Sequence, residues 1–149
     1  MTFITPTEAD IDYLALRWLA LGRYAWEQLG REFVKSERDL DVLQLLADAY
    51  VGDKAPDTLS ESLGVGLGRT VIACIPGFDW TVVDDEFGRD IALRFGATSL
   101  VANVIGMVVK RFESGEHIDF RALYRFILSQ MESFKLTTQQ RTPDIGSDA

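Results

Sequence analysis

The hydrophobic pattern of this chain changes its period at Pro76-Gly77, and that change limits what the chain can fold into. In residues 57–75, leucine and valine recur every four positions, which is the spacing of one face of an α-helix. In residues 79–95, apolar and polar side chains alternate, which is the spacing of a half-buried β-strand. A chain that carries both periods in separate segments is expected to fold as an α+β domain.

The alternating segment, residues 79–95, predicts a β-hairpin. Its first half contains Trp80 followed by β-branched residues, and the acidic run 84–88 that ends at Gly88 is typical of a turn. A third strand near residues 98–103 would extend this small antiparallel sheet.

Helical spacing is found in about five segments in all, including 57–75. Thr7 is a suitable N-cap for the first of them, because its side chain can accept a hydrogen bond from the first turn. The apolar face of this first helix is broad, so we expect it to be central and largely covered. The predicted helices cover residues 7–29, about 40–50, 57–75, 105–112 and 119–136.

The length of 149 residues fits one domain. Residues 1–136 carry the apolar positions and are predicted to form a single globular domain. Residues 137–149 are polar and contain Pro143 and Gly146, which predicts a disordered C-terminal tail.

The net charge of −8 repels phosphate backbones and anionic lipid headgroups, which argues against nucleic-acid and membrane partners. By its sign it favours a basic protein surface or a cationic small molecule. The single cysteine, Cys74, permits no disulfide within the chain. The amino terminus lacks the basic and apolar pattern of a signal peptide. These features predict a cytoplasmic location.

The segment from Gly64 to Gly68 contains three alternate glycines. A dinucleotide-binding loop requires its third glycine where Arg69 stands, and a phosphate-binding loop requires glycine at Leu63 and lysine at Arg69. Both nucleotide motifs therefore fail. Gly64 and Gly68 lie one helical turn apart, so we expect them to form a flat face against which another element packs closely.

Other residues that could take part in catalysis or metal binding do not form a recognisable site. The acidic residues 84–90 lack the spacing of a calcium loop, and one cysteine with one histidine cannot supply a zinc site. Cys74 lies in an apolar run and His117 in a polar loop, so an inert thiol and an exposed imidazole are expected. We predict no cofactor, no metal and no catalytic residue, and enzymatic activity is not favoured.

One less specific group lies along the predicted hairpin. Two arginines in it could bind a carboxylate, and a tryptophan could supply an apolar wall. The alternative is that the tryptophan fills the core and Arg89 pairs with a carboxylate at the turn. The group consists of Trp80, Asp84, Asp85, Arg89 and Arg94.

Four segments, 63–68, 79–94, 110–115 and 119–124, carry a family resemblance. Through them the chain resembles an uncharacterised bacterial family, domain of unknown function 3806, over about residues 59–131. Because this family has no assigned activity, the resemblance implies no functional residue.

Taken together, these patterns favour a non-enzymatic interaction protein with an acidic surface, of the inhibitor or immunity type. The alternative is a small-molecule-binding domain or enzyme, with a site between the hairpin and the helices. A structural subunit that associates through exposed helix faces is a third hypothesis.

Overall fold

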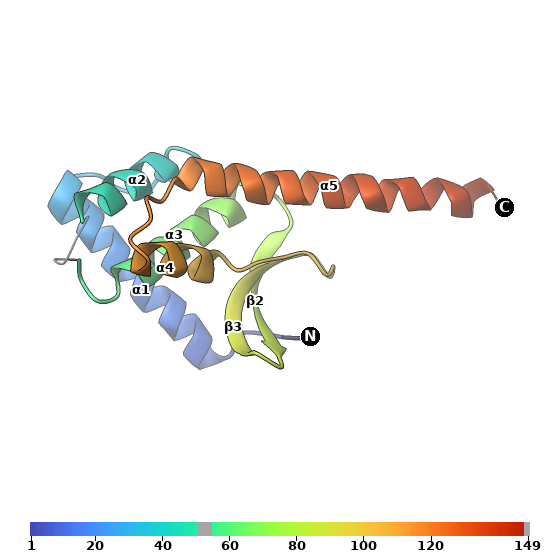
Figure 1. Ribbon diagram of the computed structural model, residues 1–149, viewed down its shortest axis with the longest axis horizontal. Coiled ribbons are helices and arrows are strands. Elements are labelled where there is room, and N and C mark those ends of the chain that lie inside the picture. The colour runs from blue at the N-terminus through green and yellow to red at the C-terminus, as the bar shows by residue number, and fades with distance from the viewer. Residues whose placement is uncertain (51–54, 148–149) are drawn as a thin grey trace.

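The computed structural model describes residues 1–50 and 55–147, with side chains described as far as residue 139. Within these residues it confirms the α+β fold, with five helices and a four-stranded antiparallel sheet (Figure 1). The helices are α1 (Glu8–Leu29), α2 (Asp39–Ala49), α3 (Leu59–Cys74), α4 (Val104–Glu113) and α5 (Phe120–Ser147). The strands are β1 (Thr2–Ile4), β2 (Phe78–Asp85), β3 (Gly88–Phe95) and β4 (Val101–Ala102).

The sheet has the order β1-β2-β3-β4, with every neighbouring pair antiparallel. The predicted hairpin is β2 and β3, which pair along their whole length from Phe78 opposite Phe95 to Asp85 opposite Gly88. The predicted third strand is the short β4. Strand β1, whose three residues pair with Val82–Asp84, was not predicted from the sequence, because alternation cannot be recognised over so short a segment.

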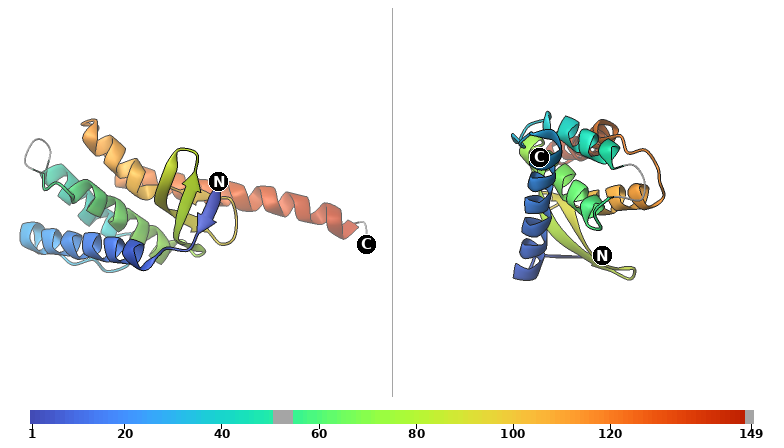
Figure 2. Two further views of the ribbon diagram at one scale, coloured as in Figure 1. Left: turned by 90° about the horizontal axis from the view of Figure 1, so that it is seen from below. Right: turned by 90° about the vertical axis from the view of Figure 1, so that its left-hand side faces the viewer.

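Helix α3 is the centre of the fold, and not α1 as the sequence led us to expect. Figure 2 shows α3 between α1 and α4, and 11 of its 16 residues are buried. Such a helix needs apolar or small residues on all its faces. Helix α1 instead buries one stripe, which includes Leu14, Leu21 and Ala25, and leaves its opposite side exposed.

The glycines of α3 confirm the prediction of close packing. A Cβ atom built on Gly64 would lie 2.6 Å from the Ile105 Cα of α4, and one built on Gly68 would lie 2.3 Å from the Trp80 ring of β2. Both distances are shorter than any normal carbon contact, so only glycine allows these elements to approach so closely.

The N-terminus of α1 is joined to the hairpin by Asp10. Asp10 and Thr7 form a capping box, in which the Thr7 N–H donates to Asp10 Oδ2 at 2.8 Å and the Asp10 N–H donates to Thr7 Oγ1 at 3.2 Å. Arg89 of β3 donates both terminal nitrogens to the same carboxylate, at 2.9 and 2.6 Å. The helix cap and the sheet are therefore held by one buried side chain.

Because of these hydrogen bonds, chiefly those from Arg89, the pKa of Asp10 lies far below its usual value of 3.8, although burial opposes the shift. As the pH falls below about 4, the unfolded chain takes up a proton that the folded protein excludes, so Asp10 stabilises the fold above that pH and progressively less below it.

We expect the stability advantage of the wild type over Asp10→Asn to shrink between pH 5 and pH 3, as measured by denaturant unfolding at each pH. Asp41→Asn, which breaks the more exposed Asp41–Arg121 pair, serves as the control; an equal pH effect in both variants would contradict this role of Asp10.

Helix α5 covers α2 at its start and then projects away from the body of the domain (Figure 1). Asp119 caps its first turn, as predicted, by accepting from the Ala122 N–H at 3.0 Å. The helical backbone continues to Ser147, across most of the segment predicted to be a disordered tail, while residues 148–149 lie outside the described residues. Residues 137–139 are exposed, and the disorder of this tail stays a prediction.

Candidate functional site

A cleft of about 340 Å³ opens between α1, α3, the first residue of α2 and strand β2. This volume falls at the lower end of the range for small-molecule sites. Its walls combine two indole rings, two cationic side chains and two carboxylates. The lining residues are Trp18, Lys35, Asp39, Arg69, Ile72, Ala73, Asp79 and Trp80.

Arg69 of α3 is the unusual residue of this cleft. Its guanidinium lies over the Trp18 ring, 4.3 Å from the ring centroid, and Trp18 in turn packs against Phe33 with 5.0 Å between centroids. Burial lowers the pKa of Arg69, but the group stays charged because arginine starts so high. Within residues 1–50 and 55–139, no carboxylate lies within 4.0 Å of it, so a partly desolvated cation stands beside open space.

Trp80 of β2 forms another wall of the cleft. Its ring packs on the bare backbone of Gly68 and beside Val104, which holds the half-buried indole in one position against α3. The Trp80 N–H of the backbone donates to Asp79 Oδ1 at 2.7 Å, so this neighbouring carboxylate is directed to the main chain. The cleft is therefore lined by two aromatic surfaces, Trp18 in contact with Arg69 and Trp80 held against α3.

The rim is formed by the connection between α1 and α2, which Asp39 holds in place. The buried Asp39 carboxylate accepts the N–H groups of Val34 and Lys35 at 2.8 and 2.9 Å. Lys35 adopts a left-handed backbone with φ 58°, which is unfavourable for a residue with a side chain. The two hydrogen bonds stabilise this conformation and bring Lys35 to the cleft.

Of the five hairpin residues that the sequence singled out, Trp80 alone lines this cleft. In an antiparallel pair, facing residues share one side of the sheet, and Trp80 and Asp84 face Leu93 and Arg89. Arg94 faces Asp79 on the other side of the sheet. Arg89 and Arg94 therefore cannot bind one ligand together with Trp80.

The other four residues of that group have separate roles. Arg89 pairs with Asp10, 79 positions away, rather than with a carboxylate of the turn. Arg94 lies over the Phe3 ring at 3.6 Å and donates to the Thr98 carbonyl at 2.6 Å. Asp85 accepts the Phe87 N–H at 2.8 Å, and Asp84 is exposed.

Cys74 and His117 lie in different surroundings, as their sequence contexts predicted. Burial, with the nearby Glu37 and Asp39, raises the pKa of the Cys74 thiol, which makes it a poor nucleophile. His117 is exposed, with Nε2 3.4 Å from Asp48 Oδ1. Within the described part of the chain, no three histidine, cysteine or acidic side chains are grouped to hold a metal ion.

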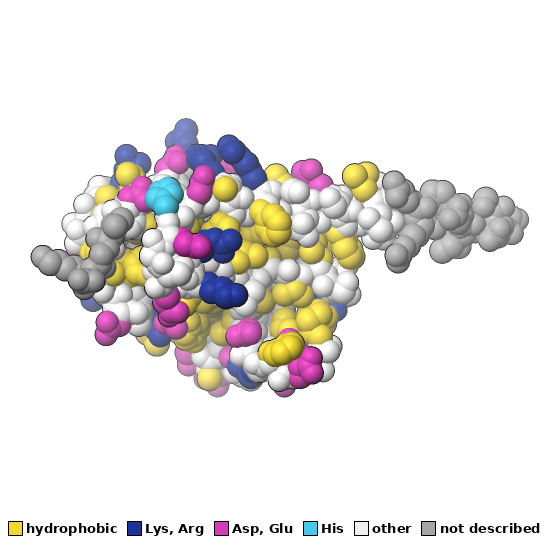
Figure 3. Space-filling view, viewed as in Figure 1, with side chains coloured by type: hydrophobic (Ala, Val, Ile, Leu, Met, Phe, Trp, Pro, Cys, Tyr) yellow, Lys and Arg dark blue, Asp and Glu magenta, His cyan; other side chains and the backbone are white. Residues whose placement is uncertain are grey.

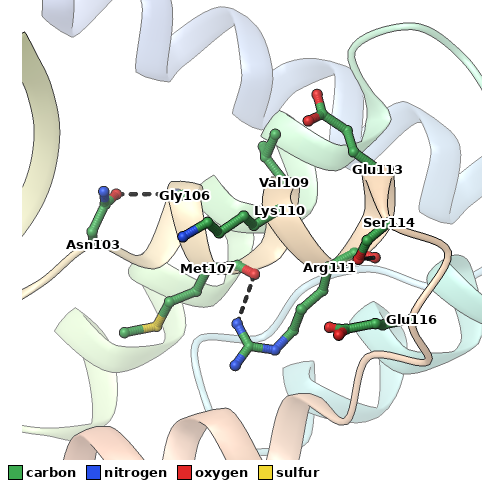
Figure 4. Close-up of a pocket in the computed structure, with 9 residues that line it drawn as sticks. All are labelled: Asn103, Gly106, Met107, Val109, Lys110, Arg111, Glu113, Ser114 and Glu116. Carbon is green, nitrogen blue, oxygen red and sulfur yellow. Dashed lines mark hydrogen bonds between the residues drawn. The ribbon is translucent and has the colours of Figure 1, made fainter.

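A wider hollow follows the outer side of α4 (Figure 4). Its most polar members are already engaged or open to solvent: Arg111 donates to the Met107 carbonyl at 2.9 Å, and Asn103 caps the helix by accepting from the Gly106 N–H at 3.0 Å. Figure 3 shows apolar side chains on the same face, below α5. The half-buried Arg111 is therefore already hydrogen-bonded and the other charged groups of the hollow are exposed, so the cleft at Arg69 is the better candidate.

Comparison with known protein families identifies the family of this chain. The model of the family described as domain of unknown function 3806 (DUF3806) matches residues 39–124, more than half of the chain. This chain belongs to the DUF3806 family. The DUF3806 match runs from α2 into the start of α5, so it begins about twenty residues before the stretch that we recognised in the sequence. It contains Asp39, Arg69 and Trp80 but not Trp18.

The fold also occurs in a solved structure. A crystal structure of a protein from Bacteroides thetaiotaomicron VPI-5482 superposes with a TM-score of 0.73 at 13% sequence identity. The alignment covers 83% of this chain and 46% of the other one, so this DUF3806 chain spans about half the length of its structural relative. At such low identity only the fold is shared. No curated protein matches the sequence significantly.

Proposed function

We propose that this domain binds a small carboxylate ligand with an aromatic or apolar body in the cleft between Trp18 and Trp80. The observation that carries the proposal is the half-buried Arg69 guanidinium, which lines the cleft without a carboxylate partner within the described residues. A cation that has lost part of its hydration is stabilised by an anion placed against its unused donors. Arginine presents these donors as a planar fork that matches a carboxylate.

The walls define the rest of the ligand. Trp18 and Trp80 offer flat apolar surfaces on which a ring or an aliphatic chain can pack. Lys35 adds a second positive charge at the rim. Because these charges act over a few ångströms, they outweigh the net charge of −8, which acts at longer range and is screened by salt.

We propose binding rather than catalysis, because the carboxylates of the cleft are already used. Asp39 accepts two backbone N–H groups and Asp79 accepts one, so neither is poised as a general base. A cytoplasmic location is part of this proposal, and within the described residues no helix has the length and hydrophobicity to span a membrane. A basic protein partner, predicted from the net charge, would use the outer acidic surface and stays a separate prediction.

Calorimetric titration with phenylacetate and its neutral analogue phenylacetamide tests this proposal. A fragment of this size is expected to bind with a Kd on the order of 1 mM. We expect phenylacetamide to bind at least about tenfold more weakly, and Arg69→Gln to weaken phenylacetate by a similar factor, because the charge-assisted hydrogen bonds are lost.

Arg125→Gln is the matched control, since Arg125 is an exposed arginine of α5 outside the cleft. It should leave the phenylacetate affinity unchanged. Equal affinity for the acid and the amide, or no difference between Arg69→Gln and the wild type, would refute the proposed role of Arg69.

A further inference from the structure

The outer side of α1 carries an apolar stripe that the domain does not cover. Ile11, Leu19 and Trp26 are 57%, 68% and 61% exposed. With Ala15 and Gly22 between them they recur at steps of four, four, three and four, so all five lie on one face of the helix. Leu16, 60% exposed, lies at the edge of this α1 stripe. An apolar face of this length on a monomer marks an interaction site.

The small residues of the stripe allow another helix to approach closely. Gly22 and Ala15 occupy its middle, and a Cβ atom on Gly22 would meet no atom of the protein within 4 Å. Two helices that meet at small residues can reach the lower end of the usual interaxial distance of about 8–10 Å. The larger Ile11 and Trp26 lie towards the two ends.

The charges beside the stripe select the direction of the second helix. Asp12 lies near the N-terminus of α1 and Arg23 near its C-terminus, on the same side of the α1 stripe, and both are exposed. Two parallel copies related by a twofold axis would place this side of one stripe against the opposite side of the other, so Asp12 would not meet Arg23. Two antiparallel copies place Asp12 of each against Arg23 of the other, and Ile11 against Trp26, with opposed helix dipoles.

We infer that α1 is a self-association surface, on which a second copy of this chain packs its own α1 in antiparallel orientation about a twofold axis. The inference rests on a surface separate from the cleft and does not depend on the proposed ligand. The twofold arrangement makes the contact isologous, so it closes at the dimer and does not continue into a filament.

Sedimentation velocity of the whole chain from low micromolar to high micromolar concentration tests this inference. We expect a concentration-dependent dimer in the wild type and a monomer in Leu19→Glu, which places two carboxylates at the centre of the interface. Leu136→Glu adds the same charge at a residue of α5 that is 58% exposed, and it should dimerise as the wild type does. A wild type that stays monomeric, or a Leu19→Glu variant that dimerises normally, would overturn the inference.

Charge reversal tests the antiparallel direction. Asp12→Arg and Arg23→Asp should each weaken the dimer about tenfold, which corresponds to about 1.4 kcal/mol, because each brings like charges together. The combined variant restores opposite charges and should recover the wild-type dissociation constant. Additive weakening in the combined variant would exclude the antiparallel arrangement.

Discussion

Replacing Phe120 by alanine is expected to lower the free energy of unfolding by about 4 kcal/mol. Phe120 is completely buried, and it is the largest of the fully buried side chains among the described residues. It begins α5, where its N–H donates to Gln44 Oε1 at 3.1 Å while Gln44 Nε2 donates to the Ile118 carbonyl at 2.8 Å. Truncation would therefore leave a cavity at the point where α5 is fixed to α2.

Phe126 provides a comparison on the same helix. It is 53% exposed, so Phe126→Ala should change the free energy of unfolding by less than about 0.5 kcal/mol. Denaturant unfolding of the two variants measures the difference. A loss of unfolding free energy at Phe120 as small as that expected at Phe126 would show that the start of α5 is not part of the core.

The second large effect is expected at Gly64, where alanine should cost about 2 kcal/mol and valine about 3 kcal/mol. The added Cβ would lie 2.6 Å from the Ile105 Cα, and a backbone atom cannot move aside unless α4 moves with it. The intrinsic preference of alanine for helices, about 1 kcal/mol over glycine, offsets only part of this strain.

Gly22→Ala is the control for the Gly64 variants, because it makes the same change in a helix where the new methyl group meets nothing within 4 Å. It should stabilise the protein by up to about 1 kcal/mol. Both changes are best compared in the Leu19→Glu background, in which dimerisation through the α1 stripe does not contribute. Stabilisation by Gly64→Ala would contradict the close α3–α4 packing.

The sequence predicted those parts of the fold that depend on local patterns. The hairpin followed from alternation within 79–95, the start of α1 from Thr7, and the close approach at Gly64 and Gly68 from their spacing. The strand β1 was missed because three residues show no period. The central position of α3 was not predicted, because its buried glycines carry no side chain and so do not add to a count of apolar residues.

The candidate site was only partly predictable, because its members come from separate elements. Trp80 was singled out, but Arg69 was considered only as a mismatch in two glycine motifs, and Trp18 lay within the predicted helix 7–29 without being singled out. No local signal joins Trp18 of α1 to Arg69 of α3, since the packing of α1 on α3 brings them together. The same holds for Arg89, whose partner Asp10 lies 79 positions earlier in the chain.

The three tryptophans allow a direct test of the cleft, because Trp18 and Trp80 line it while Trp26 lies on the outer face of α1. In nitrogen–proton correlation NMR, each indole N–H gives one signal. During titration with phenylacetate, we expect the signals of Trp18 and Trp80 to move together and saturate, while that of Trp26 stays in place. Signals of Trp18 and Trp80 that do not move, or that move no more than that of Trp26, would contradict ligand binding in this cleft.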